Sequence, residues 1–557
     1  MELSAKTRKH NLKKMISEPL DLLIIGGGIT GAGIALEAGA MGIKTGLIEM
    51  QDFAAGTSSR STKLIHGGLR YLKQFEVELV ADVSKEREII YQNARHIVKP
   101  TQMKLPIYNE VGASFTSFSG RVALDLYDRL ANVHPKDTYY MLNQEESVEN
   151  EPLLKEENLI ETGVYLDYVS DDARLTIEIL KKAHDYQSLI ANYVKAIAFI
   201  YNEEGKINGI RAIDQLTQEE FSIYANVIVN ATGPWSDKIT NLGDKQTTSQ
   251  LRPTKGVHIV VDWETLPVQG PIYTDTGLKD DRMIFIIPRK NKTYIGTTDT
   301  DYTGDLTQPH ITNDDIEYLL SALAFRFPNY LVNREDIEAS WAGLRPLIDY
   351  DDEGDPSAVS RGSSLTLSDE GLITIAGGKL TDYRRMAEGV LEKVAEELEK
   401  RTTTIYQRVD TTQIKLSGGD IPKGESFLDY VEKEAKKGME VGLTREEATA
   451  IVEWYGSNAE IIFGLATDVA IFPNLSLAET IRLYYALENE MTLTPTDYFM
   501  RRTDLLLFDL TYMQAIKKAV IEAMTEYYGW SSSQTKSMRD ELDKHIAEST
   551  LSSLKNN

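Results

Sequence analysis

Cysteine is absent from the 557 residues of this chain. Its absence excludes disulfides, thiolate metal sites, iron–sulfur clusters and a cysteine nucleophile, so any redox chemistry must come from a bound organic cofactor. The eight histidines are scattered, and no two have the His-x-x-x-His spacing of a helical zinc site. No metal site is therefore expected. A chain without cysteine also suits a reducing cytoplasm, which is the location that we expect.

Positive charge is scarce as well. Lysine and arginine number 60 against 85 acidic residues, which gives a formal net charge of −25. Such a surface repels the phosphate backbone of nucleic acids, so no nucleic-acid partner is expected. Any anionic ligand must instead be bound by a local cluster of cations.

Long uninterrupted hydrophobic runs are also missing. The apolar stretch over residues 20–43 is interrupted by glycines, Asp21 and Glu37, and no small-residue cleavage site follows it, so we interpret it as part of a soluble domain. Before it, residues 1–19 form a basic leader. A solvated leader is favoured, and peripheral contact with anionic lipid at the inner face of the membrane is the alternative. Its basic residues are Lys6, Arg8, Lys9, Lys13 and Lys14.

The stretch "LDLLIIGGGITGAGIALEAGAMGIKTGLIEM", residues 20–50, has the pattern of a nucleotide-binding βαβ unit. The run over 20–25, apolar except for Asp21, predicts a buried parallel strand, 30–41 has helical spacing, and 44–48 predicts a second strand. Glycines between the first strand and the helix let the backbone approach a pyrophosphate at the helix N-terminus. Glu49 is placed to accept hydrogen bonds from ribose hydroxyls. This pattern alone leaves NAD and FAD both open. The glycines are Gly26, Gly28 and Gly31.

The rest of the chain divides into regions of different patterning. "VIVNATGPWSD" predicts a buried strand over 227–230 that ends in small residues, which suits the close approach of a cofactor to backbone. The middle of the chain, with "GVHIVVDW" and "RMIFIIPRKNKTYIGTTD", predicts an antiparallel sheet. Amphipathic helices follow beyond about residue 405. One of them begins with a capping box of Thr444 and Glu447 in "LTREEATAIVEWYGSN".

Four long motifs resemble those of a known family. They are "GTSSRSTKLIHGGLRYL" at residues 56–72, "VNATGPW", "AGGKLTDYRRMAEG" and "DYFMRRTDLL". Together they resemble the FAD-dependent glycerol-3-phosphate dehydrogenases and oxidases, over nearly the whole chain from Leu20 to about Arg502. The resemblance implies a flavoprotein fold of the glycine-oxidase type, FAD as cofactor, and oxidation of sn-glycerol 3-phosphate to dihydroxyacetone phosphate.

The expected fold class is α/β, or α+β when the whole chain is considered. A Rossmann-like FAD-binding domain over 20–404 is interleaved with an antiparallel-sheet substrate domain, mainly at about 100–160 and 250–350. A C-terminal helical domain covers 405–557. We expect a homodimer.

Cofactor-binding residues are expected in the βαβ unit and in three of the motifs. In "IAGGKLTDYRRMAEG" a strand over 372–376 gives way to a helix that begins near Leu380, whose dipole would stabilise negative charge on a reduced flavin. The residues expected to bind FAD, from the pattern or from the resemblance, are Gly26, Gly28, Gly31, Glu49, Thr57, Ser58, Ser61, Lys63, His66, Gly67, Gly68, Ala231, Gly233, Gly378, Leu380 and Thr381.

A small phosphate ester needs its own cluster of cations in so acidic a protein. The resemblance places the family's phosphate-binding and substrate-binding residues at Arg345, Arg361 and Lys379. Guanidinium groups match the geometry of phosphate oxygens. Tyr71 is expected to add a hydroxyl to the substrate site, and Arg345 is also a candidate for a role in catalysis.

Oxidation of an alcohol requires a base for the C2 hydroxyl proton while hydride moves to flavin N5. Histidine is the usual base near neutral pH, and His258 and His66 lie in motifs that match the family. We favour His258 because it lies on a strand of the expected substrate domain. His66 belongs to the loop that is expected to cradle the cofactor, where packing against FAD would explain it.

Three functions stay open at this point. An oxidase would pass electrons to O2 and release H2O2, a dehydrogenase would pass them to a membrane quinone, and a flavin-binding protein would not turn over. "TTDTDYTGDL", "DPSAVSRGSS" and Asp382 look more like the oxidases of fermentative bacteria, so the oxidase is favoured. One departure is that "LIDYDDEGDPSAVS" has only a few acidic residues where such oxidases usually carry a long insertion.

Overall fold

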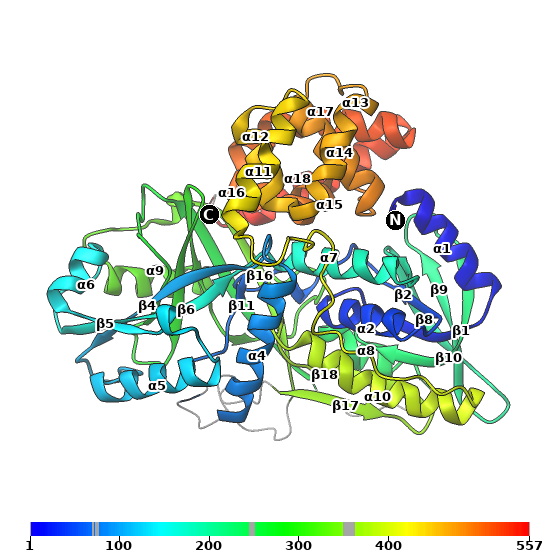
Figure 1. Ribbon diagram of the computed structural model, residues 1–557, viewed down its shortest axis with the longest axis horizontal. Coiled ribbons are helices and arrows are strands. Elements are labelled where there is room, and N and C mark those ends of the chain that lie inside the picture. Colours follow the sequence, from blue (N-terminus) through cyan, green and yellow to red (C-terminus); the bar gives the residue numbers. More distant parts are fainter. Residues whose placement is uncertain (1, 70–71, 73–76, 244–250, 349–361, 556–557) are drawn as a thin grey trace.

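The computed structural model describes residues 2–69, 72, 77–243, 251–348 and 362–555. Two β-sheets with their helices form the lower part of the molecule, and a helical domain lies above them (Figure 1). Among the described helices none is both long enough and apolar enough to cross a membrane.

The first sheet contains the predicted βαβ unit. Within the described residues it has eight strands, in the order β17-β18-β10-β1-β2-β7, with β9 paired to β10 and β8 to β9. The pairs from β18 to β7 along this order are parallel. The bounds are β1 (Leu20–Ile25), β2 (Thr45–Ile48), β7 (Leu189–Ala191), β8 (Val194–Tyr201), β9 (Ile207–Asp214), β10 (Glu220–Asn230), β17 (Ser363–Leu367) and β18 (Leu372–Gly377).

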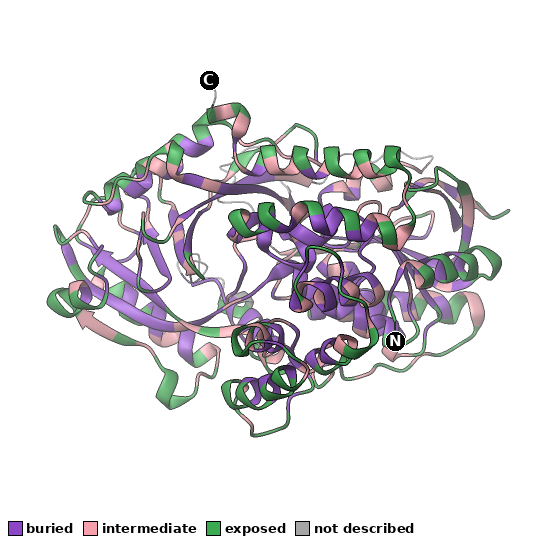
Figure 2. Cartoon of the chain, turned by 90° about the horizontal axis from the view of Figure 1, so that it is seen from above, coloured by how far each residue is buried: buried purple, intermediate pink, exposed green. Residues whose placement is uncertain are grey.

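Three helices pack with this sheet into one apolar core. They are α2 (Ile29–Ala40), α7 (Asp172–Asp185) and α10 (Tyr383–Thr402). Five of the six β1 residues are buried, because a parallel strand with helices on its faces has no solvent side. Figure 2 shows this as buried residues gathered in the strands and on the inner sides of the helices.

The start of α10 corrects one expectation. The helix was expected to begin near Leu380 but begins at Tyr383. The backbone N–H of Lys379 donates to the side chain of Asp382 over 2.7 Å, so residues 379–382 form a turn before the helix. This turn, rather than the first turn of the helix, lies at the cofactor cavity described below.

The second sheet confirms the antiparallel sheet expected in the middle of the chain. Within the described residues it has ten strands, in the order β15-β11-β14-β13-β12-β4-β6-β3, with β16 paired to β11 and β5 to β6. Only the β12–β4 pair is parallel among the described pairs of this sheet. The bounds are β3 (Leu64–Ile65), β4 (Lys99–Tyr108), β5 (Tyr140–Asn143), β6 (Leu159–Val169), β11 (Leu251–Asp262), β12 (Ile272–Asp275), β13 (Met283–Arg289), β14 (Lys292–Gly296), β15 (Thr300–Asp301) and β16 (Ile337–Ile348).

Further helices accompany the second sheet. Helices α5 and α6 contact β6, and α9 adds several buried residues to the core of this sheet. Helix α4 stands at the front of the molecule in the view of Figure 1, and the short α8 follows β10. The bounds are α4 (Val77–Asn93), α5 (Ser117–Leu130), α6 (Gln144–Asn150), α8 (Ser236–Thr240) and α9 (Asn313–Arg326).

The expected solvated leader is instead a packed helix, α1 (Ala5–Ser17), which is a correction. Arg8 is buried and pairs with Asp214 at 3.0 Å, because its neighbours Leu12 and Met15 face the first sheet and bring it to the same side. The lysines of the leader remain exposed on the other side. Contact of these lysines with a membrane stays a prediction, and so does the homodimer.

The C-terminal domain is helical, as expected, and the capping box at Thr444 is confirmed. Its helices share a core with the second sheet, in which Tyr294 and Trp341 contact Phe508. The bounds are α11 (Phe427–Glu440), α12 (Arg445–Tyr455), α13 (Ala459–Asp468), α14 (Leu477–Asn489), α15 (Pro495–Asp497), the π-helical turn η7 (Tyr498–Arg502), α16 (Leu505–Phe508), α17 (Leu510–Tyr528), α18 (Ser532–Ser549) and α19 (Ser552–Lys555).

Candidate active site

A cavity of about 640 Å³ is lined by residues of both sheets. On the first sheet the lining follows the carboxyl ends of β1, β10, β2 and β18, where ligands bind in open parallel sheets. On the second sheet it includes residues of β11, β12, β13 and β16. The cavity therefore joins a nucleotide site on one sheet to a separate group of side chains on the other.

The glycine-rich turn after β1 leaves space for a pyrophosphate. Gly26 has a φ of +118°, and a Cβ there would lie 2.5 Å from the carbonyl oxygen of Ala231. A Cβ on Gly31 would lie 1.9 Å from the carbonyl oxygen of Gly26, so only glycine allows helix α2 to start this close to the strand. The start of α2 is thus turned toward the cavity, with Gly28 as its N-cap.

Glu49 stands at the end of β2 with its carboxylate fixed by backbone. Its oxygens accept from the N–H groups of Gly27 at 2.7 Å and Gln51 at 2.9 Å. Burial raises the pKa of this carboxyl, and the two backbone donors oppose that effect. A half-buried carboxylate that accepts hydrogen bonds, beside a glycine cradle whose N–H groups donate them, suits the ribose and pyrophosphate of FAD, so the residues present fit the cofactor.

Most of the residues expected to bind FAD line the cavity. Three do not, and they support the lining from behind instead. Gly31 packs against the turn at Gly26, and the N–H of Gly67 donates to the hydroxyl of Tyr127 over 2.7 Å. The expected residues that line the cavity are Gly26, Gly28, Glu49, Thr57, Ser58, Ser61, His66, Gly68, Ala231, Gly233, Gly378, Leu380 and Thr381.

The third exception is Lys63, whose side chain is turned away from the cavity. Its ammonium group is buried and pairs with Asp172 at 2.6 Å, and it also donates to the carbonyl oxygen of Ser59. Asp172 in turn accepts from the N–H and the hydroxyl of Ser61, which does line the cavity. Lys63 therefore neutralises the carboxylate of Asp172, which in turn holds Ser61 at the cavity.

Of the four residues expected to bind the substrate, two line the cavity and two lie outside the described residues. Arg345 and Lys379 are lining residues, whereas Arg361 and Tyr71 lie outside the described residues. The guanidinium of Arg345 is oriented by Asp299 at 3.0 Å and by the hydroxyl of Thr297 at 3.2 Å. A cation with a fixed orientation is suited to recognise a phosphate of defined position.

Arg282 is a lining cation that sequence reasoning missed. It precedes β13, its guanidinium stacks on the ring of Tyr318 at 5.3 Å, and it donates to the carbonyl oxygens of Thr297 and Asp299. It therefore lies beside Arg345, which contacts the same segment. None of the four family motifs contains Arg282, so only its place in the fold reveals it.

His258 is held on the central part of the second sheet by its neighbours on both sides. Across the strands it is in register with Gly296 of β14 and Trp341 of β16. Its ring stacks on the indole of Trp341, with 4.7 Å between centroids and 8° between planes. Its Nε2 lies 3.0 Å from the hydroxyl oxygen of Thr62, and its buried Nδ1 has no hydrogen-bond partner among the described residues.

Electrostatics keep the His258 imidazole neutral. Burial lowers its pKa well below the ordinary value, and the positive charges of Arg345 and Lys63 lower it further. At neutral pH the ring therefore carries a free lone pair on one nitrogen. The other candidate base, His66, also lines the cavity and makes an edge-on contact with Phe285 at 5.9 Å.

Comparisons with known proteins agree with this architecture. A family model described as "FAD dependent oxidoreductase" matches residues 21–384, and one described as "C-terminal domain of alpha-glycerophosphate oxidase" matches residues 409–535. The alpha-glycerophosphate oxidases of Streptococcus pneumoniae and Lactococcus lactis are 46% and 45% identical to this chain, each over 100% of both chains. The X-ray structure of the glycerol-3-phosphate dehydrogenase from Bacillus halodurans, complexed with FAD, is 39% identical over 98% of both chains, with a TM-score of 0.84.

A nucleotide-binding sheet joined to an antiparallel sheet by one cavity defines a flavin-dependent oxidoreductase. Within that class, the chain belongs to the alpha-glycerophosphate oxidase family of FAD-dependent oxidoreductases. The family and the cofactor expected from the motifs are thereby confirmed.

Proposed function

We propose that this protein oxidises sn-glycerol 3-phosphate to dihydroxyacetone phosphate with FAD and passes the electrons to O2, giving H2O2. The observation that carries the proposal is one continuous cavity, in which the nucleotide site is followed by a buried neutral histidine and a group of cations. The naming of full-length relatives at 46% identity as alpha-glycerophosphate oxidases supports the substrate and the acceptor.

In this proposal the phosphate group of the substrate is bound by Arg345, Lys379 and Arg282. All three line the cavity of a chain whose net charge is −25, so they supply the local positive potential that a dianion needs. Asp299 and Thr297 hold the Arg345 guanidinium in place, which lowers the entropy lost on binding. Arg361, from the same resemblance, is proposed as a further partner.

His258 is proposed to take the proton of the C2 hydroxyl. The neutral ring supplies the lone pair for this step, and the contact of its Nε2 with the Thr62 hydroxyl, at 3.0 Å, holds the ring in place. A neutral ring is ready for this step without prior deprotonation. FAD, when bound, supplies the hydride acceptor at its N5 atom. His66 is assigned to packing beside the cofactor, where Phe285 contacts it.

An anaerobic titration of the yellow protein tests the reaction. Addition of sn-glycerol 3-phosphate should bleach the flavin band, and glycerol should bleach it far less, because glycerol lacks the phosphate that the cations bind. Equal bleaching by both would contradict the phosphate site. A flavin that neither compound bleaches would favour a flavin-binding protein without turnover.

A quinone-dependent dehydrogenase is the second candidate, and specific observations favour it. The similar Bacillus halodurans structure is named a glycerol-3-phosphate dehydrogenase. In addition, the alignment with the Streptococcus pneumoniae oxidase runs over 609 positions against the 557 residues of this chain, so that oxidase has residues that this chain lacks.

The two acceptors are separated by the reoxidation half-reaction. Substrate-reduced protein is mixed with air-saturated buffer, and absorbance and peroxide are followed. Reoxidation on the timescale of turnover, with one H2O2 per flavin, supports the oxidase. Reoxidation far slower than turnover with a quinone analogue means that the dehydrogenase is correct.

A further inference from the structure

Two segments of the first sheet line the nucleotide end of the cavity and are held together by backbone. One follows β2 and contributes Glu49 and Gln51, and the other is the start of β8, with Val194. The N–H of Val194 donates to the carbonyl oxygen of Glu49 over 2.7 Å, and that of Tyr193 to Gln51 over 2.8 Å. We call residues 49–57 the ribose loop and residues 192–196 the β8 start.

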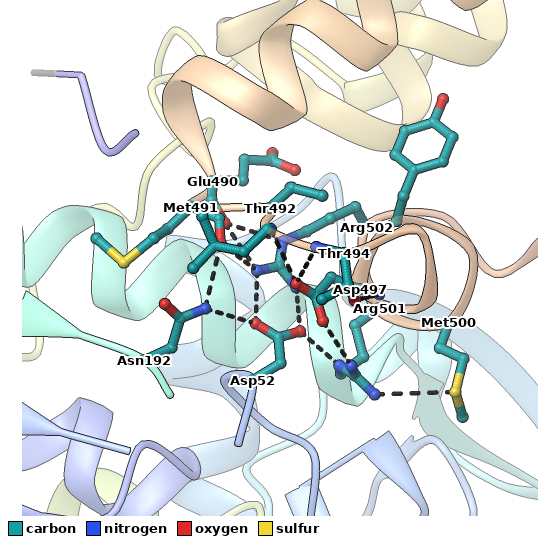
Figure 3. A network of polar contacts seen from close by, with 12 residues as sticks. Asp52, Asn192, Glu490, Met491, Thr492, Thr494, Asp497, Met500, Arg501 and Arg502 are labelled. Carbon is teal, nitrogen blue, oxygen red and sulfur yellow. Dashed lines mark hydrogen bonds and ion pairs between the residues drawn. The ribbon is translucent and has the colours of Figure 1, made fainter. Parts of the chain in front are cut away.

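The ribose loop is clamped from behind by the C-terminal domain through Asp52 (Figure 3). Asp52 Oδ2 accepts from Arg501 Nε at 2.5 Å and from Arg502 Nη1 at 2.6 Å, while Oδ1 accepts from Arg502 Nη2 at 2.8 Å. The side chains of Asp52 and Arg502 are both 0% exposed. Unlike its neighbours Gln51 and Ala54, Asp52 does not line the cavity, so the loop presents one face to the cofactor and the other to the arginines.

The β8 start is held by the same part of the C-terminal domain. The hydroxyl of Tyr193 donates to Asp497 over 2.6 Å, and the amide of Asn192 donates both to Asp52 and to the carbonyl oxygen of Met491. Asp497 also pairs with Arg501 at 3.0 Å. One buried network therefore reaches both segments that line the nucleotide end.

The carboxylate of Asp52 stays ionised at neutral pH. Burial alone would raise the pKa of Asp52, but Arg502 and Arg501 outweigh burial and lower it to about 2. A buried carboxylate with two guanidinium partners is costly to separate, because either side would be left as an uncompensated charge. The conformation of the ribose loop therefore depends on its ion pairs with Arg501 and Arg502 of η7.

We propose that Arg501 and Arg502 are positioning residues for FAD, which hold the ribose loop directly through Asp52 and the β8 start through Asp497. No described residue beyond 381 lines the cavity, so the C-terminal domain acts on the cofactor through segments that it supports from behind. The proposal concerns retention of the cofactor and is independent of the substrate and of the electron acceptor.

Hydrogen exchange tests the coupling in the intact protein. Because coupling between two sites is reciprocal, FAD that binds the ribose loop must stabilise the residues that clamp it. We expect amides of residues 490–502 to exchange several-fold more slowly in the FAD-loaded protein than in the apoprotein. In the Asp52→Asn variant this difference should disappear. Equal exchange at 490–502 with and without FAD in the unaltered protein would overturn the proposal.

FAD affinity tests the direction of the effect. Asp52→Asn keeps the shape of the side chain but removes its charge, and we expect the dissociation constant of FAD to rise at least about 10-fold. Asp504→Asn is the matched control, because Asp504, in the C-terminal domain, is likewise a buried aspartate with two cationic partners, Arg289 and Lys290. Its partners lie on the second sheet and its turn, so FAD affinity should stay within about 2-fold while thermal stability falls.

Loss of FAD by both variants in proportion to their loss of thermal stability would overturn the proposal, since the clamp would then be merely structural. At saturating FAD, the rate of flavin reduction in Asp52→Asn should remain within about 3-fold of the unaltered protein. If Asp52→Asn does not fold, Tyr193→Phe removes a single hydroxyl of the same network. Weaker FAD binding by Tyr193→Phe supports the proposal, and unchanged binding contradicts it.

Discussion

Replacing Gly296 by alanine should displace the proposed base without touching substrate or cofactor residues. A Cβ at this position would lie 2.2 Å from Cδ2 and 2.6 Å from Nε2 of His258. Carbon atoms in ordinary contact are about 3.5 Å apart, so the ring must move by about 1 Å. Movement away from Gly296 is opposed by Trp341, which stacks on the same ring from the strand on the other side.

The expected loss in rate follows from that displacement. A misplacement of about 1 Å in a reacting group costs on the order of 100-fold, and complete removal of a general base costs about 100-fold to 10,000-fold. We expect Gly296→Ala to reduce flavin about 100-fold more slowly. The overpacked site should also lose about 1 to 3 kcal/mol of unfolding free energy. FAD content should be unchanged.

Anaerobic stopped-flow absorbance with saturating sn-glycerol 3-phosphate measures the reduction rate directly. Gly464→Ala is the control, because a Cβ there meets nothing within 4 Å. His258→Ala and the double variant complete a cycle: if Gly296→Ala acts through His258, it should add little once His258 is gone. A normal reduction rate in Gly296→Ala, or a full 100-fold loss in the His258→Ala background, would refute this reasoning.

Three further predictions follow from charges in the structure. Arg345→Gln should lower kcat/KM for sn-glycerol 3-phosphate by an amount that corresponds to about 1.5 to 3 kcal/mol of transition-state binding. The slow reaction with glycerol should be nearly unchanged, and equal losses for both substrates would contradict the phosphate role of Arg345. Because the pKa of His258 is lowered, the rate of flavin reduction at saturating substrate should stay constant as pH falls to 6.5 and decline only below it; a decline that begins above pH 6.5 would argue against His258. Burial, assisted by Glu388, raises the pKa of Glu37 from 4.5 to about 8, so the folded state binds the extra proton and loses stability as pH rises through that window. Glu37→Gln should therefore gain about 4 to 5 kcal/mol of unfolding free energy at pH 8.5 and nothing near pH 4.5. A gain of equal size at both pH values in chemical denaturation would be inconsistent with this cause.

Local features of the sequence determined the nucleotide half of the site. The βαβ unit depends on apolar periodicity and on glycines whose need is steric, and both are properties of consecutive residues. The expected strand over 20–25 and the helix after it therefore appear with nearly the predicted bounds. Gly26 and Glu49 line the cavity as expected. The four family motifs were also similar enough to those of known proteins to indicate the family and its cofactor.

Side-chain direction within a motif was decided only by tertiary packing. Lys63 lies in a motif that surrounds the cofactor, yet its ammonium group is paired with Asp172 of helix α7 and does not line the cavity. Arg282 lies in none of the four family motifs, yet it lines the cavity. A sequence pattern predicts which segment approaches a ligand, but the neighbours contributed by other segments decide which side chains turn toward it.

Pairings between distant segments were decided by the tertiary structure alone. Helix α1 is basic by composition, but Arg8 is buried because Asp214 meets it from another strand. Asp52 and Arg502 are 450 positions apart, and nothing in the sequence around either residue indicates that it is buried or paired with the other. Their ion pair exists because the C-terminal domain packs behind the ribose loop, and burial of both charges makes that pairing obligatory.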